Sequence, residues 1–243
     1  MKQMIFITGT DTGVGKTVLT ALLAEFLRRR GVRVAALKPV CSGGRADARR
    51  LQRALAGTLA LDDINPWHFR APIAPLLAAR KENRVVKLAA VLSHIQAVGR
   101  EFDVVLVEGA GGLLSPLGEK FDSRDLMSAL GAKPVIVAAN RLGVVNQILL
   151  TLEALPERLP PVAKVVLMAP PKPDLATRLN VRLLQQLSVP EVHQVPWLGG
   201  KFAAGVVTQS PRLRRVLGAI AAWPGAPRGR AQGKASSFHK TPR

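Results

Sequence analysis

The sequence predicts an α/β fold in which a mainly parallel, doubly wound sheet carries helices on both faces. Short runs typical of buried strands alternate with amphipathic helical patterns, and the connecting segments are short. Polar or glycine-rich segments follow several of the strands, which is where ligands bind in open α/β sheets. The 243 residues are enough for one large domain.

The first strand and the loop after it are the most specific feature. The pattern predicts a buried strand over residues 4–8 and a helix over residues 18–30. Between them lies Gly9-Thr10-Asp11-Thr12-Gly13-Val14-Gly15-Lys16-Thr17, which has the layout of a phosphate-binding loop. The usual pattern has its first glycine at position 10, whereas this chain has that glycine one residue earlier. The fold is therefore expected to be P-loop NTPase-like.

Each position of this loop has a physical role. Gly13 and Gly15 would let successive backbone N–H groups turn toward a phosphate, because no Cβ is in the way. Lys16 would reach the outer phosphates, and the Thr17 hydroxyl would hold Mg²⁺. The alternative is an ordinary glycine-rich turn between strand and helix, with Lys16 in solvent.

The rest of the chain repeats the alternation of strand and helix. The expected strands are residues 32–37, 103–107, 133–139, 162–168 and 192–195. The expected helices are residues 46–56, 85–100, 122–130, a segment containing Asn146 and Gln147, 174–186 and 210–223. Residues 65–75 are expected to form a proline-punctuated loop.

The net charge of +19 does not by itself predict nucleic-acid binding. Five of the basic residues lie in residues 224–243, a segment without acids and with few apolar groups, so we expect a basic, disordered tail after a domain of residues 1–223. Tyrosine is absent and aromatic residues make up 4% of the chain, so stacking platforms for bases are lacking. We expect anionic small molecules rather than nucleic acid as partners.

The expected location is the cytoplasm. No apolar run approaches the roughly 20 residues of a membrane span, and no signal-peptide pattern precedes the first strand. Cys41 is the single cysteine, which excludes a disulfide framework and fits a reducing compartment.

Charged residues at or near the ends of two expected strands are further candidates for the site. Lys38 follows the strand of residues 32–37, and Glu108 follows the apolar strand of residues 103–107. A carboxylate at such a position is typical of a nucleotide site, where it faces Mg²⁺. Asp47 could serve as a metal ligand or could simply favour the first turn of its helix, and Lys38 could be a solvated strand end.

Taken together, these residues resemble the dethiobiotin synthetase family over about residues 2–199. The family has its own variant of the phosphate loop, which matches the threonine at position 10. The segments that carry the resemblance are residues 9–17, Lys38-Pro39-Val40 with Ser42-Gly43, Asp47, Asn65-Pro66 with Phe69, Glu108-Gly109-Ala110-Gly111-Gly112, Leu142-Gly143 with Asn146, and Pro196-Trp197-Leu198.

The resemblance implies a ligase of biotin biosynthesis that uses ATP as co-substrate and Mg²⁺ as cofactor. Its substrates would be 7,8-diaminopelargonate and carbon dioxide, and its product dethiobiotin, a cyclic urea formed through a phosphorylated carbamate. The segment of residues 142–146 resembles one that completes the partner's site, so a homodimer is expected.

The resemblance also implies a role for each matching residue. Catalysis is assigned to Lys16 and Lys38, and metal binding to Thr17, Asp47 and Glu108. The implied nucleotide-binding residues are Gly13, Val14, Gly15, Lys16, Thr17, Val18, Asp47, Glu108, Gly109, Ala110, Gly111, Pro196, Trp197 and Leu198. The implied substrate-binding residues are Thr12, Lys38, Ser42, Gly111, Gly112, Leu142, Gly143 and Asn146.

Three positions depart from the family pattern and keep a related ligase with another substrate open. Ala169-Pro170 stands where the family has an Asn-Asp pair that contacts adenine, so the nucleotide preference is open. Ala74-Pro75-Leu76 replaces a Ser-Pro-His stretch, and Gln147 replaces a histidine.

Two other classes of P-loop protein fit the sequence less well. A ParA- or MinD-like ATPase switch would have an extra lysine early in the phosphate loop, where this chain has Asp11, and the basic tail is the one feature in its favour. A cobyrinate-type amide ligase would need a glutaminase domain, for which the chain is too short.

Overall fold

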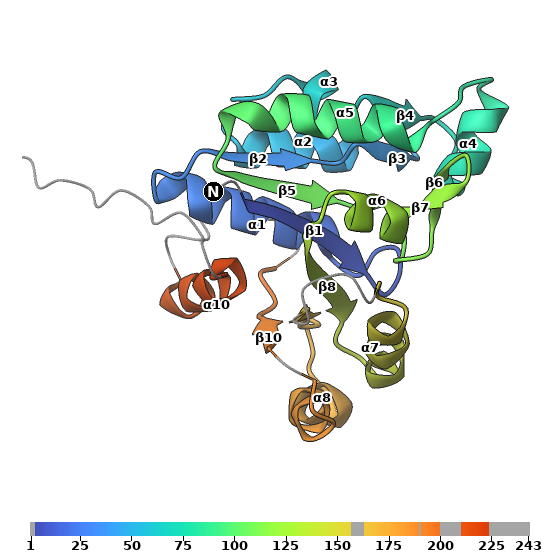
Figure 1. Cartoon of the computed structure of the whole chain (residues 1–243). Helices are drawn as coiled ribbons and strands as arrows, with labels where there is room; N and C mark the ends of the chain where they lie inside the picture. Colours follow the sequence, from blue (N-terminus) through green and yellow to red (C-terminus); the bar gives the residue numbers. More distant parts are fainter. Residues whose placement is uncertain (1–2, 157–162, 190, 200–209, 224–243) are drawn as a thin grey trace, which may run out of the picture.

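A computed structural model describes residues 3–156, 163–189, 191–199 and 210–223. Its core is a six-stranded parallel sheet with the order β10-β9-β8-β1-β5-β2. Figure 1 shows β1 in the middle of this sheet, between β5 and β8. The strands are β1 (Gln3–Gly9), β2 (Val34–Leu37), β5 (Val104–Glu108), β8 (Lys133–Ala139), β9 (Lys164–Met168) and β10 (Val192–Val195). The predicted parallel, doubly wound sheet is confirmed.

Alternate residues of β1 face opposite layers of helices. Ile5 and Ile7 are buried with α1 (Lys16–Arg29), α2 (Ala46–Ala54) and α10 (Pro211–Ala221). Phe6 points to the other face, which carries α5 (Leu88–Val98) and α6 (Ser123–Ala129). Both layers consist of aliphatic and aromatic side chains, so the central strand is buried between two apolar layers, as is typical of parallel sheets.

The half of the sheet formed by β8, β9 and β10 has a separate hydrophobic cluster, on the same face as Phe6. Ile136 and Ala138 of β8 are buried there against α7 (Val144–Glu153) and α8 (Leu175–Gln186). The layers thus hold the carboxyl ends of all six strands along one edge, where the polar segments that follow the strands meet.

Several short elements are absent from the sequence prediction. The expected loop of residues 65–75 contains β4 (Trp67–Phe69), which pairs in parallel with β3 (Val40–Ser42) just after Lys38. The others are α3 (Leu61–Ile64), α4 (Pro75–Lys81), the 3₁₀ turn η1 (Gly99–Glu101), β6 (Pro116–Gly118) and β7 (Phe121–Asp122). Periodicity missed β3 and β4 because pairing between three-residue strands far apart in the chain leaves no local pattern, and the other elements are short, from two to seven residues.

The predicted start of the helix at Asp122 or Ser123 is confirmed by its cap. The Asp122 carboxylate accepts from Asp125 N at 2.9 Å, and the Asp125 carboxylate accepts from Asp122 N at 3.0 Å. This reciprocal pair satisfies donors that the first turn leaves free. The expected tail of residues 224–243 lies outside the described residues. Within the described ranges, no helix has the length and apolarity needed to cross a membrane.

Candidate active site

The phosphate-binding loop joins β1 to α1 at the centre of the sheet. Gly15 caps α1 with φ 104°, a left-handed conformation that favours glycine, and Lys16 and Thr17 form the first turn. Gly9 packs closely: a Cβ at this position would lie 2.8 Å from Val14 Cγ2. The displaced first glycine is therefore needed for packing, and the loop keeps its N–H groups and the helix N-terminus beside one cavity.

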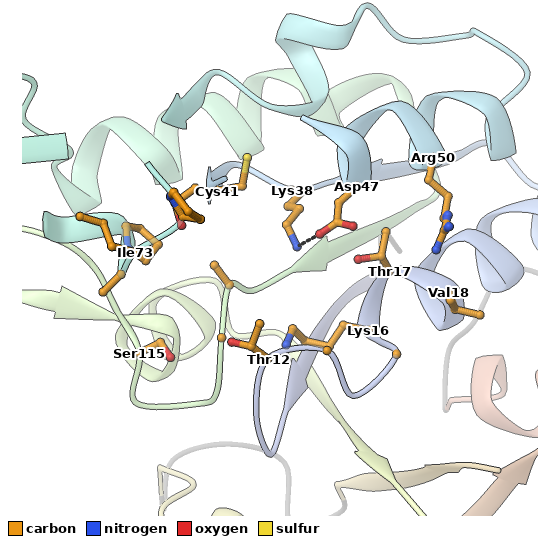
Figure 2. Close-up of a pocket in the computed structure, with 18 residues that line it drawn as sticks. Thr12, Lys16, Thr17, Val18, Lys38, Cys41, Asp47, Arg50, Ile73 and Ser115 are labelled. Carbon is orange, nitrogen blue, oxygen red and sulfur yellow. Dashed lines mark ion pairs between the residues drawn. The ribbon is translucent and has the colours of Figure 1, made fainter. Parts of the chain in front are cut away.

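A charged cavity of about 610 Å³ opens at the ends of β1, β2 and β5. Figure 2 shows Lys16 and Thr17 entering it from α1, and Asp47 and Arg50 from α2 on the opposite side. Its lining residues are Thr12, Gly13, Gly15, Lys16, Thr17, Val18, Lys38, Cys41, Ser42, Asp47, Arg50, Pro72, Ile73, Ala74, Pro75, Ala110, Gly111 and Ser115.

Lys38 is the centre of an ion-pair network in this cavity. Its Nζ lies 2.6 Å from Glu108 Oε1 and 3.0 Å from Asp47 Oδ2, and it is buried rather than a solvated strand end. The Thr17 hydroxyl donates to the same Glu108 oxygen at 2.6 Å. Burial alone would lower the pKa of Lys38, but the two carboxylates outweigh it and raise that pKa above its ordinary value. These two carboxylates therefore favour the charged form of Lys38.

Lys16 lies in a different electrostatic environment. Its Nζ donates to the backbone oxygen of Asp11 at 2.8 Å, and the side chain is buried. Burial, followed by repulsion from Lys38, lowers the pKa of Lys16 from 10.5 to about 8, against the attraction of Glu108 and Asp47. Among the described residues these carboxylates do not form an ion pair with Lys16 and do not offset its burial, and the phosphates of a bound nucleotide would supply the negative charge it needs.

A buried asparagine holds the segment that carries Lys38. The amide of Asn65 donates to Lys38 O at 2.7 Å, and its Oδ1 accepts from the Cys41 thiol at 3.2 Å. Lys38 N in turn donates to Ile64 O at 2.9 Å. These bonds fix the backbone on either side of Lys38, so the Asn65 segment noted in the sequence has a structural role next to the site.

A second, apolar cavity of about 390 Å³ adjoins the first, on the side of β8, β9 and β10. Its lining residues are Gly13, Val14, Gly15, Val18, Arg50, Ala139, Asn140, Arg141, Met168, Ala169, Pro170, Pro196, Trp197, Leu198 and Gly199. The Asn140 amide group is already used inside the protein, because it donates to Thr177 O and accepts from Asn180, both at 2.8 Å. The Ala169 N–H donates to Val195 O.

The structure brings most of the predicted site residues together. The charged cavity is lined by Thr12, Gly13, Gly15, Lys16, Thr17, Val18, Lys38, Ser42, Asp47, Ala110 and Gly111, and the apolar cavity by Gly13, Val14, Gly15, Val18, Pro196, Trp197 and Leu198. Glu108 lies behind the charged cavity and reaches it through Lys38 and Thr17. Their binding roles stay predictions.

Besides Glu108, five predicted residues line neither cavity of this chain. Gly109 packs against Phe6 and Ser123, and Gly112 N donates to Ser115 Oγ at 2.8 Å, so both shape the loop after β5. Leu142, Gly143 and Asn146 lie at or just before the start of α7 and are absent from both linings, although the preceding Arg141 lines the apolar cavity.

Sequence reasoning missed several lining residues. Arg50 could have been found, because it follows Asp47 by one helical turn and faces the same side. Cys41 and the segment Pro72–Pro75 enter through the pairing of β3 with β4, and Ser115 through the loop after β5, for which no local signal exists.

Comparisons with known proteins agree with this geometry. A family model described as AAA domain matches residues 3–200. The chain is 42% identical over 199 residues to the ATP-dependent dethiobiotin synthetase BioD of Anaeromyxobacter dehalogenans (strain 2CP-C), covering 79% of this chain and 89% of that relative. It is 41% identical over 156 residues to the protein of the same name from Methanocaldococcus jannaschii, covering 63% and 73%.

A solved structure of pNOB8 ParA bound to nonspecific DNA superposes with a TM-score of 0.55 at 15% identity, covering 89% of this chain and 95% of that one. At that identity the likeness shows the P-loop NTPase-like fold alone. The family assignment depends instead on the sequence relatives and on the family model, whose match over residues 3–200 includes the lining of both cavities. The chain belongs to the dethiobiotin synthetase family.

Proposed function

We propose that this protein is an ATP-dependent ligase that closes the cyclic urea of dethiobiotin from 7,8-diaminopelargonate and carbon dioxide. The observation that carries the proposal is the position of Lys38: a buried amine held by Glu108 and Asp47, opposite Lys16 of the phosphate loop. A cavity with two such cations suits a reaction in which a carboxylate-like group meets a terminal phosphate. Family membership supports the same reaction.

The chemistry divides into three steps that balance. One amine of the substrate adds to carbon dioxide and loses a proton, which gives a carbamate. A carbamate oxygen then attacks the γ-phosphorus of ATP, and ADP leaves. Finally the second amine attacks the carbamate carbon and gives up one proton to the departing phosphate, the C–O bond breaks, and the ring closes as inorganic phosphate leaves with that oxygen. Lys16 and Lys38 stabilise the negative charge on phosphate and carbamate, and the rest of the site positions the groups.

The residues around the loop fit Mg²⁺, which stays part of the proposal. Thr17, Asp47 and Glu108 offer the oxygen ligands that Mg²⁺ prefers, and Glu108 Oε2 is a buried oxygen without a hydrogen-bond partner among the described residues. Across the described ranges there is no cluster of three or more His, Cys, Asp or Glu side chains suited to a metal. Binding would therefore depend on the phosphates of the nucleotide. When bound, Mg²⁺ neutralises charge on the transferred phosphoryl group.

The part of the charged cavity beyond the lysines would hold the diamino acid. Thr12 and Ser42 offer hydroxyl groups, and Ile73 offers an apolar surface on the same side as Cys41. This mixture suits a substrate with an aliphatic chain and polar ends. Gly111 lets that chain approach the backbone, and Gly112 fixes the loop through Ser115.

A homodimer is also part of the proposal. The start of α7 presents Leu142 at 83% exposure, and Leu150 of the same helix is 63% exposed. Apolar side chains left in water at this point favour burial against a second copy. The expected role of Leu142, Gly143 and Asn146 in the partner's site, the cytoplasmic location and the division into residues 1–223 and 224–243 stay predictions.

The geometry of the site does not support the alternative of a ParA- or MinD-like ATPase switch. Asp11, which stands where that class has its extra lysine, is exposed and accepts a hydrogen bond from Thr12 N at 2.6 Å. A carboxylate in this slot cannot supply positive charge to a phosphate.

The test is a reaction with purified protein, 7,8-diaminopelargonate, bicarbonate, MgCl₂ and ATP. We expect dethiobiotin by mass spectrometry, with one ADP and one phosphate released per product. Phosphate release that does not require the diamino acid, without dethiobiotin, would instead indicate a switch or a ligase with another substrate.

A further inference from the structure

Arg50 lies where the charged cavity and the apolar cavity meet. Among the residues that the structure describes, Gly13, Gly15, Val18 and Arg50 line both cavities, and of these four Arg50 is the one with a charged side chain. Figure 2 shows it reaching from α2 toward the first turn of α1, on the same side of the cavity as Asp47. The guanidinium group therefore faces the phosphate loop across the space that connects the two cavities.

The guanidinium group of Arg50 attracts the Asp47 carboxylate and helps to lower its pKa, but the two do not form an ion pair within the described part of the chain. No hydrogen bond or ion pair of Arg50 is found there, although Asp47 lies one turn away, because that carboxylate is held by Lys38 at 3.0 Å. Arg45 of the same segment differs: it donates to Leu61 O and Asn65 O and pairs with Asp62. Arg50 is half-buried yet has no such structural partner, so its donors are available to a ligand.

The two cavities fix what such a ligand would present to Arg50. A nucleoside triphosphate with its base in the apolar cavity and its terminal phosphate between Lys16 and Lys38 must pass its inner phosphates through the junction. A planar guanidinium group matches two phosphate oxygens at once, which a lysine cannot do.

We propose, on the basis of the ATP-dependent function proposed above, that Arg50 binds the α-phosphate of the nucleotide from the side opposite the phosphate loop. It is a nucleotide-binding residue that closes the junction over the polyphosphate chain. Because ATP and ADP share the α-phosphate, Arg50 contributes equally to the binding of both. It does not act on the transferred phosphoryl group, so its contribution is the same before and during the transfer.

The test is the equilibrium binding of ATP, ADP and adenosine to the full chain with MgCl₂, which needs no diamino acid. Arg50→Ala should lower the affinity for ATP and for ADP by the same factor, about tenfold or more, and leave the affinity for adenosine unchanged. Arg50→Lys keeps the charge but loses the planar fork, so it should recover part of the loss. Arg49→Ala is the matched control, because Arg49 is the neighbouring, exposed arginine and lines neither cavity.

Kinetics give a second readout. In Arg50→Ala the KM for ATP should rise by the same factor as the dissociation constant, while kcat at saturating ATP stays within about twofold of wild type. A lower affinity for ATP with an unchanged affinity for ADP would place Arg50 at the γ-phosphate and overturn the proposal. Unchanged binding of both nucleotides, or a wild-type protein that binds neither, would also overturn it. If the protein makes no dethiobiotin but its ATP binding still depends on Arg50, the proposed substrate is wrong and the proposal for Arg50 stands.

Discussion

The two cavities that meet at the phosphate loop are built in opposite ways. In the charged cavity, Lys38, Glu108, Thr17 and Asp47 form one network of bonds between 2.6 and 3.0 Å, supplied by three separate elements. In the apolar cavity, most side chains are aliphatic or aromatic, and the Asn140 amide is committed elsewhere. The comparison suggests that phosphate chemistry depends on fixed charges, whereas base binding depends on shape. Substitutions should therefore be severe in the first cavity and mild in the second.

The largest effect is expected from Lys38→Met. Glu108 would lose its cation in a site where its side chain is fully buried, and such a loss costs about 3 kcal/mol of unfolding free energy. Turnover should fall at least ~100-fold, because charge stabilisation at the reacting group is removed. Urea denaturation and phosphate release measure the two effects.

The double variant Lys38→Met/Glu108→Gln separates the effect on stability from the effect on turnover. Removing both charges should recover most of the stability, because no buried ion is left unpaired, while turnover stays low. A double variant that regains turnover would show that Lys38 serves the fold and not the reaction.

Lys16→Ala comes next. The phosphates of ATP would lose their closest ammonium group, and we expect a turnover loss on the order of 3 kcal/mol. The fold should survive, because the removed amine donates to a single backbone oxygen and its burial is unfavourable to its charge. A variant with wild-type turnover would be incompatible with the role given to the phosphate loop.

The same lysine predicts a pH effect of intermediate size. With a pKa of about 8 in the free protein, about half of Lys16 is neutral at pH 8, and bound phosphates would favour its charged form. ATP binding should therefore take up about half a proton per site at pH 8 and almost none at pH 6.5, and affinity should fall as pH rises above 8. Titration calorimetry in two buffers of different ionisation enthalpy measures the uptake, and Lys16→Ala should abolish it.

The smallest effect on turnover is expected when the base of the nucleotide, which would lie in the apolar cavity, is changed. Ala169 has no polar side chain, its N–H is bonded to Val195 O, and Pro170 has no N–H, so neither can read a base edge through a side chain or amide proton. GTP or CTP should support turnover within about tenfold of ATP, because an apolar site discriminates weakly. A hundredfold preference for ATP would mean that backbone groups near Pro196, Trp197 and Leu198 read the base.

The sequence predicted the large elements of the fold because each has a local pattern. The strand of residues 133–139 matches β8 exactly in its bounds, and the cap at Asp122 marked α6. The same holds for the phosphate loop, Lys38 and Glu108, which could be placed at one edge because the carboxyl ends of parallel strands lie together.

What the sequence could not predict are interactions between distant residues. The alternatives open for Lys38, solvated or functional, could be decided only with Glu108 and Asp47 in place, because the three come from different elements. The short pair β3 and β4 brings Cys41 and the Pro72–Pro75 segment to the cavity without any periodic signal. Arg50 was missed for a different reason: on an arginine-rich helix, its spacing of one turn from Asp47 is the feature that separates it from its exposed neighbour Arg49.

The most direct test of the account follows one oxygen atom. If the charged cavity transfers phosphate to a carbamate, an oxygen of carbon dioxide must leave with the phosphate when the ring closes. We therefore expect that ¹⁸O-labelled bicarbonate, used before it exchanges with water, gives one labelled oxygen in the released phosphate for each dethiobiotin formed. Dethiobiotin accompanied by unlabelled phosphate would contradict the phosphorylated carbamate, and with it the role assigned to Lys16 and Lys38.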